Sequence, residues 1–269
     1  KEGEQHDRAA LGLAADQLAL VQAVHAALPR VKKALVVVSG GAVSTEQVEG
    51  MVGATIWSGK AGMQAGAGLA VLLYGDAEFS GRVAATIYKE EWAAASDFTD
   101  SAISGGKQPR GYRYMAASDA QQYVLYPFGT GLSYHSYSTS FDEPRYTISA
   151  DALRSGGNVT ISATVAVRRG EASATPARSV LLFLSGDVAS DKMGGLPQRV
   201  EWLGDFAKVK GVGGSSVAVL TLGVDALSRW VPQGGAASRS FTAGSYQVQT
   251  GSYRLRLTDS SDTATLTVT

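Results

Sequence analysis

Ionisable side chains crowd the start of this chain, where the first eight residues read KEGEQHDR. Glu2 or Glu4 could exchange a proton with a substrate if burial raised the pKa of its carboxyl group toward the working pH. The same residues could instead be solvated carboxylates near a chain end, without a chemical role. Residue types alone leave both interpretations open.

Several other chemistries lack the residues that they need. The chain has no cysteine, which excludes disulfides, thiol catalysis and cysteine-ligated metal sites. It has no G-x-S-x-G nucleophile elbow, and its histidines, His6, His25 and His135, are dispersed, so we expect neither a serine nucleophile nor a metal site.

Charge and hydropathy narrow the choice of partners. Lysine plus arginine equals aspartate plus glutamate at 24 each, so no net charge draws the chain to nucleic acid or to an anionic membrane surface. No apolar run is long enough to span a bilayer. We therefore expect neither nucleic acid nor a membrane span among its partners.

Glycines between Trp57 and Tyr74 raise the question of a nucleotide site. Gly66 and Gly68 form part of a G-x-G-x-x-[GA] pattern, but no strand directly precedes it, and only Glu90 and Glu91 stand near the expected acidic position. Close packing of a helix on a sheet explains these glycines better, so no cofactor is expected. A nucleotide-binding α/β protein stays a remote alternative.

Four tryptophans could stack on sugar rings: Trp57, Trp92, Trp202 and Trp230. Trp57 ends an expected strand, and Trp202 and Trp230 fit core or edge positions of a β-sandwich. Trp92 lies in an irregular stretch and is therefore the one weak candidate for contact with a substrate.

The first half of the chain alternates helix and strand. Apolar spacing predicts a helix over 14–28, strands over 34–38 and 54–57, a short helix within 45–53 and an apolar, buried helix over 66–74. This order predicts an α/β fold with a mostly parallel sheet. Residues 89–121 lose the rhythm and are expected to form a long surface excursion.

From Tyr146 onward the apolar residues recur with period two. Val159, Ile161, Ala163, Val165 and Val167 alternate with polar or small residues, and glycine-rich turns separate the similar runs that follow. The pattern predicts an antiparallel β-sandwich of roughly seven strands. The expected domains are 1–137 and 146–269, joined by a linker over 138–145.

Several motifs follow one another along the chain in the order found in a known protein family. Trp57, Gly59, Gly62, Gln64, Gly66, Leu72, Gly75-Asp76, Ser80-Gly81-Arg82, Thr86 and Tyr88 are followed by Tyr112-Arg113-Tyr114 and by YPFGTGLSY over 126–134. They resemble the second domain of glycoside hydrolase family 3, the β-xylosidase and β-glucosidase family. The later β-rich part is similar to the fibronectin type III-like domain that ends many members.

The resemblance implies a role for the first residues. The stretch EGEQHDR resembles a loop of the β-xylosidase branch whose first glutamate is the general acid/base, so Glu2 is the implied catalytic residue. Asp7 and Arg8 match a pair expected to anchor the loop. Retaining glycosidases use two carboxyl groups about 5–5.5 Å apart. The implied nucleophile is an aspartate of a (β/α)8 domain that this sequence lacks, so we expect a fragment or processed chain that needs that domain as partner.

Departures from the family pattern keep a second interpretation open. Lys60-Ala61 replaces Tyr-Pro, Ala65 and Ala67 interrupt a Gly-Gly pair, Glu78-Phe79 replaces Asn-Pro and Ala84 replaces a proline. The alternative is a non-catalytic relative that serves as a structural or carbohydrate-binding subunit.

Asn158, the only asparagine, begins the triplet Asn158-Val159-Thr160. This glycosylation sequon points weakly to a secreted or lumenal protein.

Overall fold

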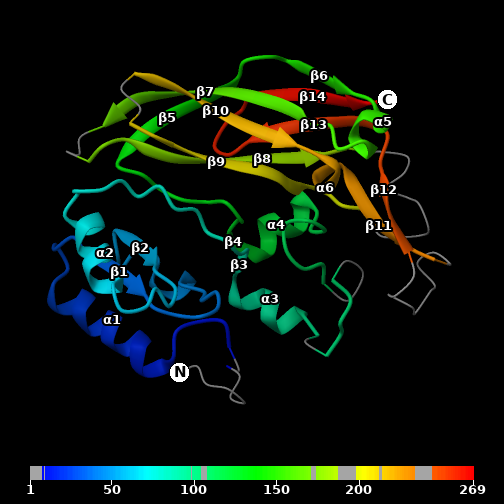
Figure 1. The fold of residues 1–269 in the computed structure, drawn as a ribbon. Coiled ribbons are helices and arrows are strands. Elements are labelled where there is room, and N and C mark those ends of the chain that lie inside the picture. The colour runs from blue at the N-terminus through cyan, green and yellow to red at the C-terminus, as the bar shows by residue number, and fades with distance from the viewer. Residues whose placement is uncertain are drawn as a thin grey trace. The chain divides into compact units, whose positions relative to one another are not determined.

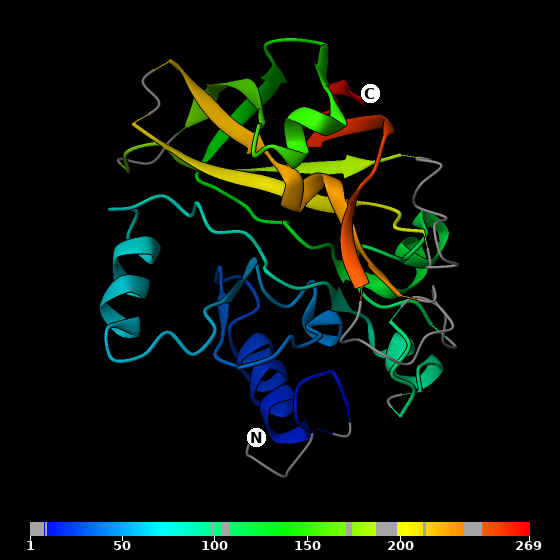
Figure 2. The ribbon, with the colours of Figure 1, turned by 45° about the vertical axis from the view of Figure 1, so that its right-hand side comes forward.

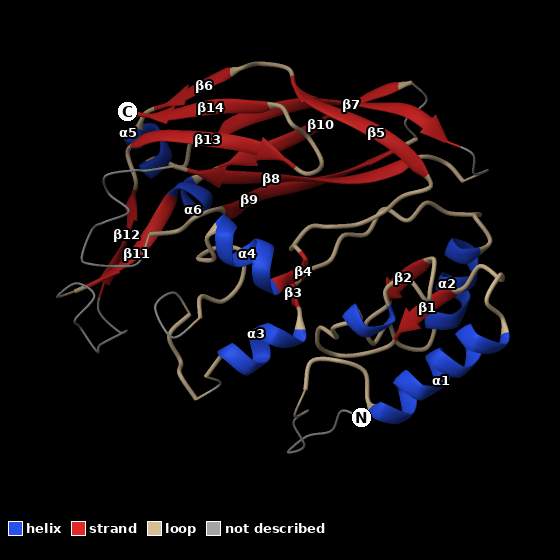
Figure 3. Ribbon diagram, turned by 180° about the vertical axis from the view of Figure 1, so that it is seen from behind, coloured by secondary structure: helices blue, strands red, loops and turns tan. Residues whose placement is uncertain are grey.

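The structure is a computed structural model that describes residues 8, 10–97, 99–103, 108–170, 174–186, 198–211, 214–233 and 244–269. The chain divides into two compact units. The described residues within 1–74, 83–111 and 115–130 form the first unit, and those within 75–82, 112–114 and 131–269 form the second. Figure 3 shows that helices dominate the first unit and strands the second.

The first unit begins with a helix and a small parallel sheet. Strands β1 and β2 pair in parallel, with Val36 opposite Ile56, and the Ser58 amide donates to the Val37 carbonyl oxygen at 3.0 Å. The expected α/β order is confirmed here, because short apolar strands alternate with helical segments. The elements are α1 (Ala15–Ala27), β1 (Ala34–Val37), the 3-10 turn η1 (Glu46–Val48), β2 (Ala54–Trp57) and α2 (Ala65–Leu73).

The expected burial of helix α2 is wrong. The helix has no buried residue, and 43% of the surface of both Val71 and Leu73 is exposed. Figure 2 shows α2 (cyan) standing apart from β1 and β2. An apolar helix predicts burial only if something packs against it, and the described residues provide no such cover.

The expected excursion over 89–121 contains more structure than its composition indicated. Helix α3 occupies Glu90–Ala95 and helix α4 occupies Ala117–Tyr123. Short strands β3 (Ile87–Tyr88) and β4 (Val124–Tyr126) pair in an antiparallel arrangement on either side of this stretch. The excursion is therefore closed at its base by a strand pair.

The second unit is a β-sandwich of two sheets (Figure 1). One sheet has the order β10-β7-β5 and the other β6-β14-β13-β8-β9. All pairs are antiparallel except β6 with β14. The elements are β5 (His135–Phe141), β6 (Arg145–Ile148), α5 (Ala150–Arg154), β7 (Val159–Gly170), β8 (Ala177–Ser185), β9 (Trp202–Lys210), β10 (Ser215–Leu222), α6 (Val224–Leu227), β13 (Gly251–Leu257) and β14 (Thr263–Val268).

Period-two alternation fills the core between the sheets. On β7 the inward residues Ile161, Ala163 and Val165 are fully buried, as the alternation predicts. Strand β10 uses the opposite phase: Val217 and Val219 face outward, while Ala218, Leu220 and Leu222 are buried. The core includes Ala218, Leu220, Leu222, Val180, Leu182, Leu184, Trp202, Tyr253, Leu255, Leu257, Leu266 and Val268.

Strands β11 (Ser228–Pro232) and β12 (Gly244–Val248) form a separate two-stranded ribbon. Trp230 lies directly opposite Tyr246, with the ring centroids 5.2 Å apart. Trp202 instead lies in the core at 3% exposure, donates to the Ala226 carbonyl oxygen at 2.9 Å and packs edge-on against Tyr253. The expected core position of Trp202 is thus confirmed, whereas Trp230 lies on a ribbon that is separate from the two sheets of the sandwich.

The boundary between the units differs from the expected one. Strand β5 occupies the first half of the expected linker over 138–145, and β6 begins at its last residue. Residues 75–82 and 112–114 also belong to the sandwich unit. Tyr112 shows why: its hydroxyl receives the Leu203 amide at 3.3 Å and its ring packs edge-on against Phe183.

A buried carboxylate joins residues 75–82 to the sandwich. Glu78 is 5% exposed. Its Oε1 accepts the Tyr134 amide at 2.5 Å, and its Oε2 contacts His135 Nδ1 and lies 3.2 Å from the Tyr137 hydroxyl. Beside them, Ser133 Oγ donates to the Phe79 carbonyl oxygen at 2.8 Å. These bonds satisfy a charge whose burial would otherwise be strongly unfavourable.

Arginines and a tyrosine surround this carboxylate. Burial, followed by the negative charge of Glu78, raises the pKa of Tyr137 to about 12. Burial also lowers the pKa of the Arg82 and Arg178 guanidinium groups. The negative charge of Asp259 acts in the other direction and raises the pKa of both. Asp259 Oδ2 lies 3.8 Å from Arg82 Nη2 and 3.1 Å from Arg178 Nη2. The segment is therefore held by several polar contacts.

No helix among the described residues is both long and apolar enough to cross a bilayer.

Replacing Trp202 by alanine should destabilise the sandwich by about 3–5 kcal/mol, because the change leaves a large cavity and removes a buried hydrogen bond. The measurement is denaturant unfolding of the whole chain, followed by tyrosine and tryptophan fluorescence. Trp230→Ala is the matched control, since Trp230 is only half-buried. Equal losses in the two variants would contradict the assignment of Trp202 to the core.

Replacing Glu78 by alanine should lower the free energy of unfolding by about 3–5 kcal/mol, because it leaves buried donors without their acceptor. Glu143→Ala removes an exposed carboxylate near the same strand and should change it by less than about 0.5 kcal/mol. Thermal unfolding of both variants under one buffer condition decides the point. A Glu78→Ala chain as stable as the parent would show that the carboxylate does not hold the segment.

Candidate functional site

The implied acid/base, Glu2, lies outside the described residues, as do Glu4 and Asp7. The structure describes the end of their loop. Arg8 Nη2 donates to the Ala42 carbonyl oxygen at 2.6 Å, and Nη1 donates to the Leu11 carbonyl oxygen at 3.4 Å. Arg8 is half-buried. It therefore fastens the loop to the segment that follows β1, as a loop anchor should.

A second fastening comes from helix α3. Glu90, the first residue of that helix, accepts the Leu11 amide with Oε1 at 3.2 Å and the Gly12 amide with Oε2 at 2.8 Å. The Ser44 amide donates to the Leu11 carbonyl oxygen at 2.9 Å. One carboxylate thus holds two successive amides, and hydrogen bonds to a charged acceptor are stronger than neutral ones. Arg8, Leu11 and Gly12 are therefore held by two parts of the first unit, the segment that contains Ala42 and Ser44 and the first residue of α3.

Trp92, the weak candidate for substrate contact, is 5% exposed. Its ring stacks on Tyr88, with centroids 4.0 Å apart and planes inclined by 11°. The Tyr88 hydroxyl in turn receives the Gly111 amide at 2.5 Å. A ring covered in this way has little face left for a sugar. Contact between Trp92 and a substrate stays a prediction, and it would require the stack to open.

The glycine-rich stretch around α2 shows no phosphate-type cradle. Gly59 and Gly62 have φ of 60° and 76°, values that favour glycine. The expectation that Gly66 and Gly68 permit close helix–sheet packing is wrong, because a Cβ at either position would meet nothing within 4 Å. Trp57, the last residue of the neighbouring strand β2, donates a hydrogen bond from Nε1 to Ser39 Oγ at 2.9 Å.

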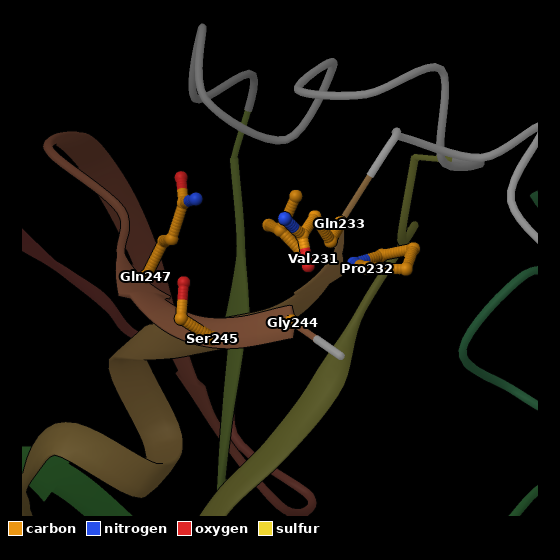
Figure 4. A pocket seen from close by; sticks show the side chains of 6 residues that line it. All are labelled: Val231, Pro232, Gln233, Gly244, Ser245 and Gln247. Atoms are coloured by element: carbon orange, nitrogen blue, oxygen red, sulfur yellow. The ribbon is translucent and has the colours of Figure 1, made fainter. Parts of the chain in front are cut away.

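No three histidine, aspartate or glutamate side chains among the described residues come together as metal ligands. His25 instead pairs through Nδ1 with the Met51 carbonyl oxygen at 3.2 Å. A shallow hollow lies on the β11–β12 ribbon (Figure 4). None of its lining side chains is titratable, so it offers no acid/base chemistry; they are Val231, Pro232, Gln233, Gly244, Ser245 and Gln247.

Sequence reasoning missed two carboxylates that the structure makes prominent. In the sequence, Glu78 stood out only as a departure from the family pattern, and His135 only as one of three dispersed histidines. In the structure their side chains are in contact. Glu90 was considered only for a nucleotide site, but it holds the Leu11 and Gly12 amides. The available signal was the Glu78 substitution itself, which replaces an amide by a carboxylate, since a carboxylate that becomes buried needs a compensating partner.

Comparison with known proteins identifies the first half of the chain. Residues 1–134 match the family model described as the glycosyl hydrolase family 3 C-terminal domain. The chain is 30% identical over 174 residues to β-D-xylosidase 1 of Arabidopsis thaliana, which covers 62% of this chain and 22% of that protein. It is 27% identical over 284 aligned positions to the probable exo-1,4-β-xylosidase bxlB of Aspergillus flavus, covering 99% and 34%.

Solved structures show the same fold. A GH3 exo-β-xylosidase, XlnD, solved with a xylobiose aziridine activity-based probe, superposes with a TM-score of 0.78 at 19% identity, covering 100% of this chain and 34% of that one. The β-glucosidase from Kluyveromyces marxianus in complex with glucose gives a TM-score of 0.73 at 22% identity, covering 100% and 30%.

The chain spans about a third or less of the length of these relatives. Its motifs, the family match over the first half and an α/β unit followed by a β-sandwich all lead to one assignment. The chain belongs to glycoside hydrolase family 3 and corresponds to the C-terminal part of that family's enzymes.

Proposed function

We propose that this chain is the C-terminal portion or subunit of a retaining β-glycosidase that acts on terminal β-linked xylose or glucose. Glu2 serves as the general acid/base. The nucleophile is an aspartate of a (β/α)8 domain that lies outside residues 1–269. Relatives named β-xylosidases and β-glucosidases support the substrate class.

The observation that carries this proposal is the fastening of Arg8, Leu11 and Gly12. An acid/base glutamate must be held in place, because a small displacement of a catalytic group costs rate. Arg8 and Glu90 fix the chain just after the loop that contains Glu2. A fixed loop end is what the positioning of Glu2 requires.

In the proposed mechanism Glu2 gives up one proton in the first step and takes one back in the second. In the first step the Glu2 carboxylic acid gives its proton to the glycosidic oxygen as the leaving group departs, while the aspartate attacks the anomeric carbon. In the second step the Glu2 carboxylate takes a proton from the water that hydrolyses the glycosyl–enzyme ester. The sugar keeps its configuration, because the anomeric carbon is attacked twice.

The exposed apolar surface of α2 is consistent with an assembly. Val71, Leu73 and Tyr74 lie in the open within the described structure, and apolar surface of this kind is covered when a partner element packs on it. Secretion or a lumenal location also stays a prediction, and the sequon at Asn158 is its support. A fibronectin type III relationship of the sandwich stays a prediction as well.

The decisive test is kinetic and uses the complete enzyme with its (β/α)8 domain. Glu2→Ala should slow hydrolysis of xylobiose or of an alkyl xyloside by about 10²–10⁴-fold, because these poor leaving groups need the proton. An activated aryl xyloside should lose much less in its first step, and azide should partly restore turnover by replacing water as the second nucleophile. Glu46→Ala, an exposed carboxylate in the same unit, is the control.

Equal losses on both substrate types would count against Glu2 as the acid. A complete wild-type assembly that hydrolyses neither xylosides nor glucosides would support the alternative, a non-catalytic structural or carbohydrate-binding subunit. Residues 1–269 alone should show no turnover, since a retaining mechanism needs both carboxyl groups.

The role of Glu90 can be measured without activity. Glu90→Ala should speed hydrogen exchange at the Leu11 and Gly12 amides by about 10-fold or more, because each amide loses a charged acceptor. Glu91→Ala is the matched control: Glu91 is the next residue of α3 and accepts Gln122 Nε2 at 2.7 Å instead. Unchanged exchange in Glu90→Ala would show that the loop end is held by other contacts.

A further inference from the structure

Asn158 and Thr160 stand together at the start of β7, the central strand of the β10-β7-β5 sheet. They are two residues apart in the triplet Asn-Val-Thr, and both are exposed. The short loop that contains Asn158 joins helix α5 to strand β7. Among the described residues, no hydrogen bond engages the Asn158 side chain.

The backbone before Asn158 is fixed by the end of α5. The Gly156 amide donates to the Leu153 carbonyl oxygen at 3.0 Å, and the Gly157 amide donates to the Ala152 carbonyl oxygen at 2.8 Å. Gly156 has φ of 86°, and a Cβ at Gly157 would lie 2.8 Å from the Ala152 carbonyl oxygen. The turn therefore needs glycine at both positions. The turn places Asn158 at the surface, directly before the first residue of β7.

The strand after Asn158 fixes the direction of the threonine. Ile161 is fully buried, so its neighbour Thr160 points to the opposite, solvent-facing side of the sheet. Thr160 lies directly opposite Thr221 of β10, which is also exposed. Because the core residues of β7 set this register, the threonine hydroxyl cannot turn inward without moving the strand.

We propose that Asn158 is an acceptor site for an N-linked oligosaccharide. The donor is an oligosaccharide carried on a polyprenyl diphosphate. The Asn158 amide nitrogen forms a bond to the anomeric carbon of the first sugar and loses one proton, and the bond from that carbon to the diphosphate oxygen breaks. The sequon supplies the recognition pattern, and the open turn supplies access to it. The proposal does not depend on whether Glu2 is catalytic.

The test is expression of the full chain through the secretory pathway of a eukaryotic cell, followed by intact mass measurement before and after peptide-N-glycosidase treatment. The wild-type chain should carry a glycosidase-sensitive increment, and peptide mapping should then find aspartate at position 158. Because Asn158 is the only asparagine in the sequence, any N-linked sugar is assigned without ambiguity.

Matched variants distinguish an effect of losing the sequon from an effect of disturbing the fold. Asn158→Gln and Thr160→Ala should abolish the increment, whereas Thr160→Ser should keep it. Thr221→Ala changes the cross-strand partner, leaves the sequon intact and should also keep it. A wild-type chain secreted at its bare polypeptide mass, or an increment that survives Asn158→Gln, would overturn the proposal.

Discussion

The interaction on which the second unit depends is the burial of the Glu78 carboxylate. A charge removed from water must be matched by donors, and Tyr134, His135 and Tyr137 supply them from one short stretch at the start of β5. The contact joins positions 57 residues apart and makes residues 75–82 part of the sandwich. The chain therefore has no single point at which one unit ends and the other begins.

Local sequence patterns predicted the limits of helices and strands well, but they predicted poorly which residues of those elements are buried. Helix α1 and strands β1 and β2 appear within a residue or so of their expected limits, because apolar spacing is a property of the segment itself. Burial of α2 failed because it depends on a second element. On β10 apolar residues occupy both phases of the alternation, and the structure buries Ala218, Leu220 and Leu222 while Val217 and Val219 stay exposed. Alternation alone does not say which of the two sets faces the core.

The candidate site shows a similar division. Glu2 came from family resemblance, and no local pattern of charge or spacing could have set it apart from Glu4. The contacts that hold the following residues could not be predicted, because Glu90 lies 78 residues from Gly12 and reaches it only in the folded chain. Arg8 was expected to anchor the loop together with Asp7, which lies outside the described residues, and the described contacts of the Arg8 guanidinium are to backbone carbonyl groups. Carbonyl partners leave no sequence signal.

The polar contacts around residues 75–82 have a consequence for how the chain folds as it is made. Arg82 reaches Asp259 in the turn between β13 and β14, so the partner of this segment is made long after the segment itself. The same is true of Arg178, whose contacts lie at Thr258 and Asp259. Contacts so distant in sequence form slowly, since a long loop must close before they stabilise anything. Before β13 and β14 are made, the segment that ends in Arg82 is held by its contacts with Ser133, Tyr134, His135 and Tyr137, and the sandwich is completed only when those two strands exist.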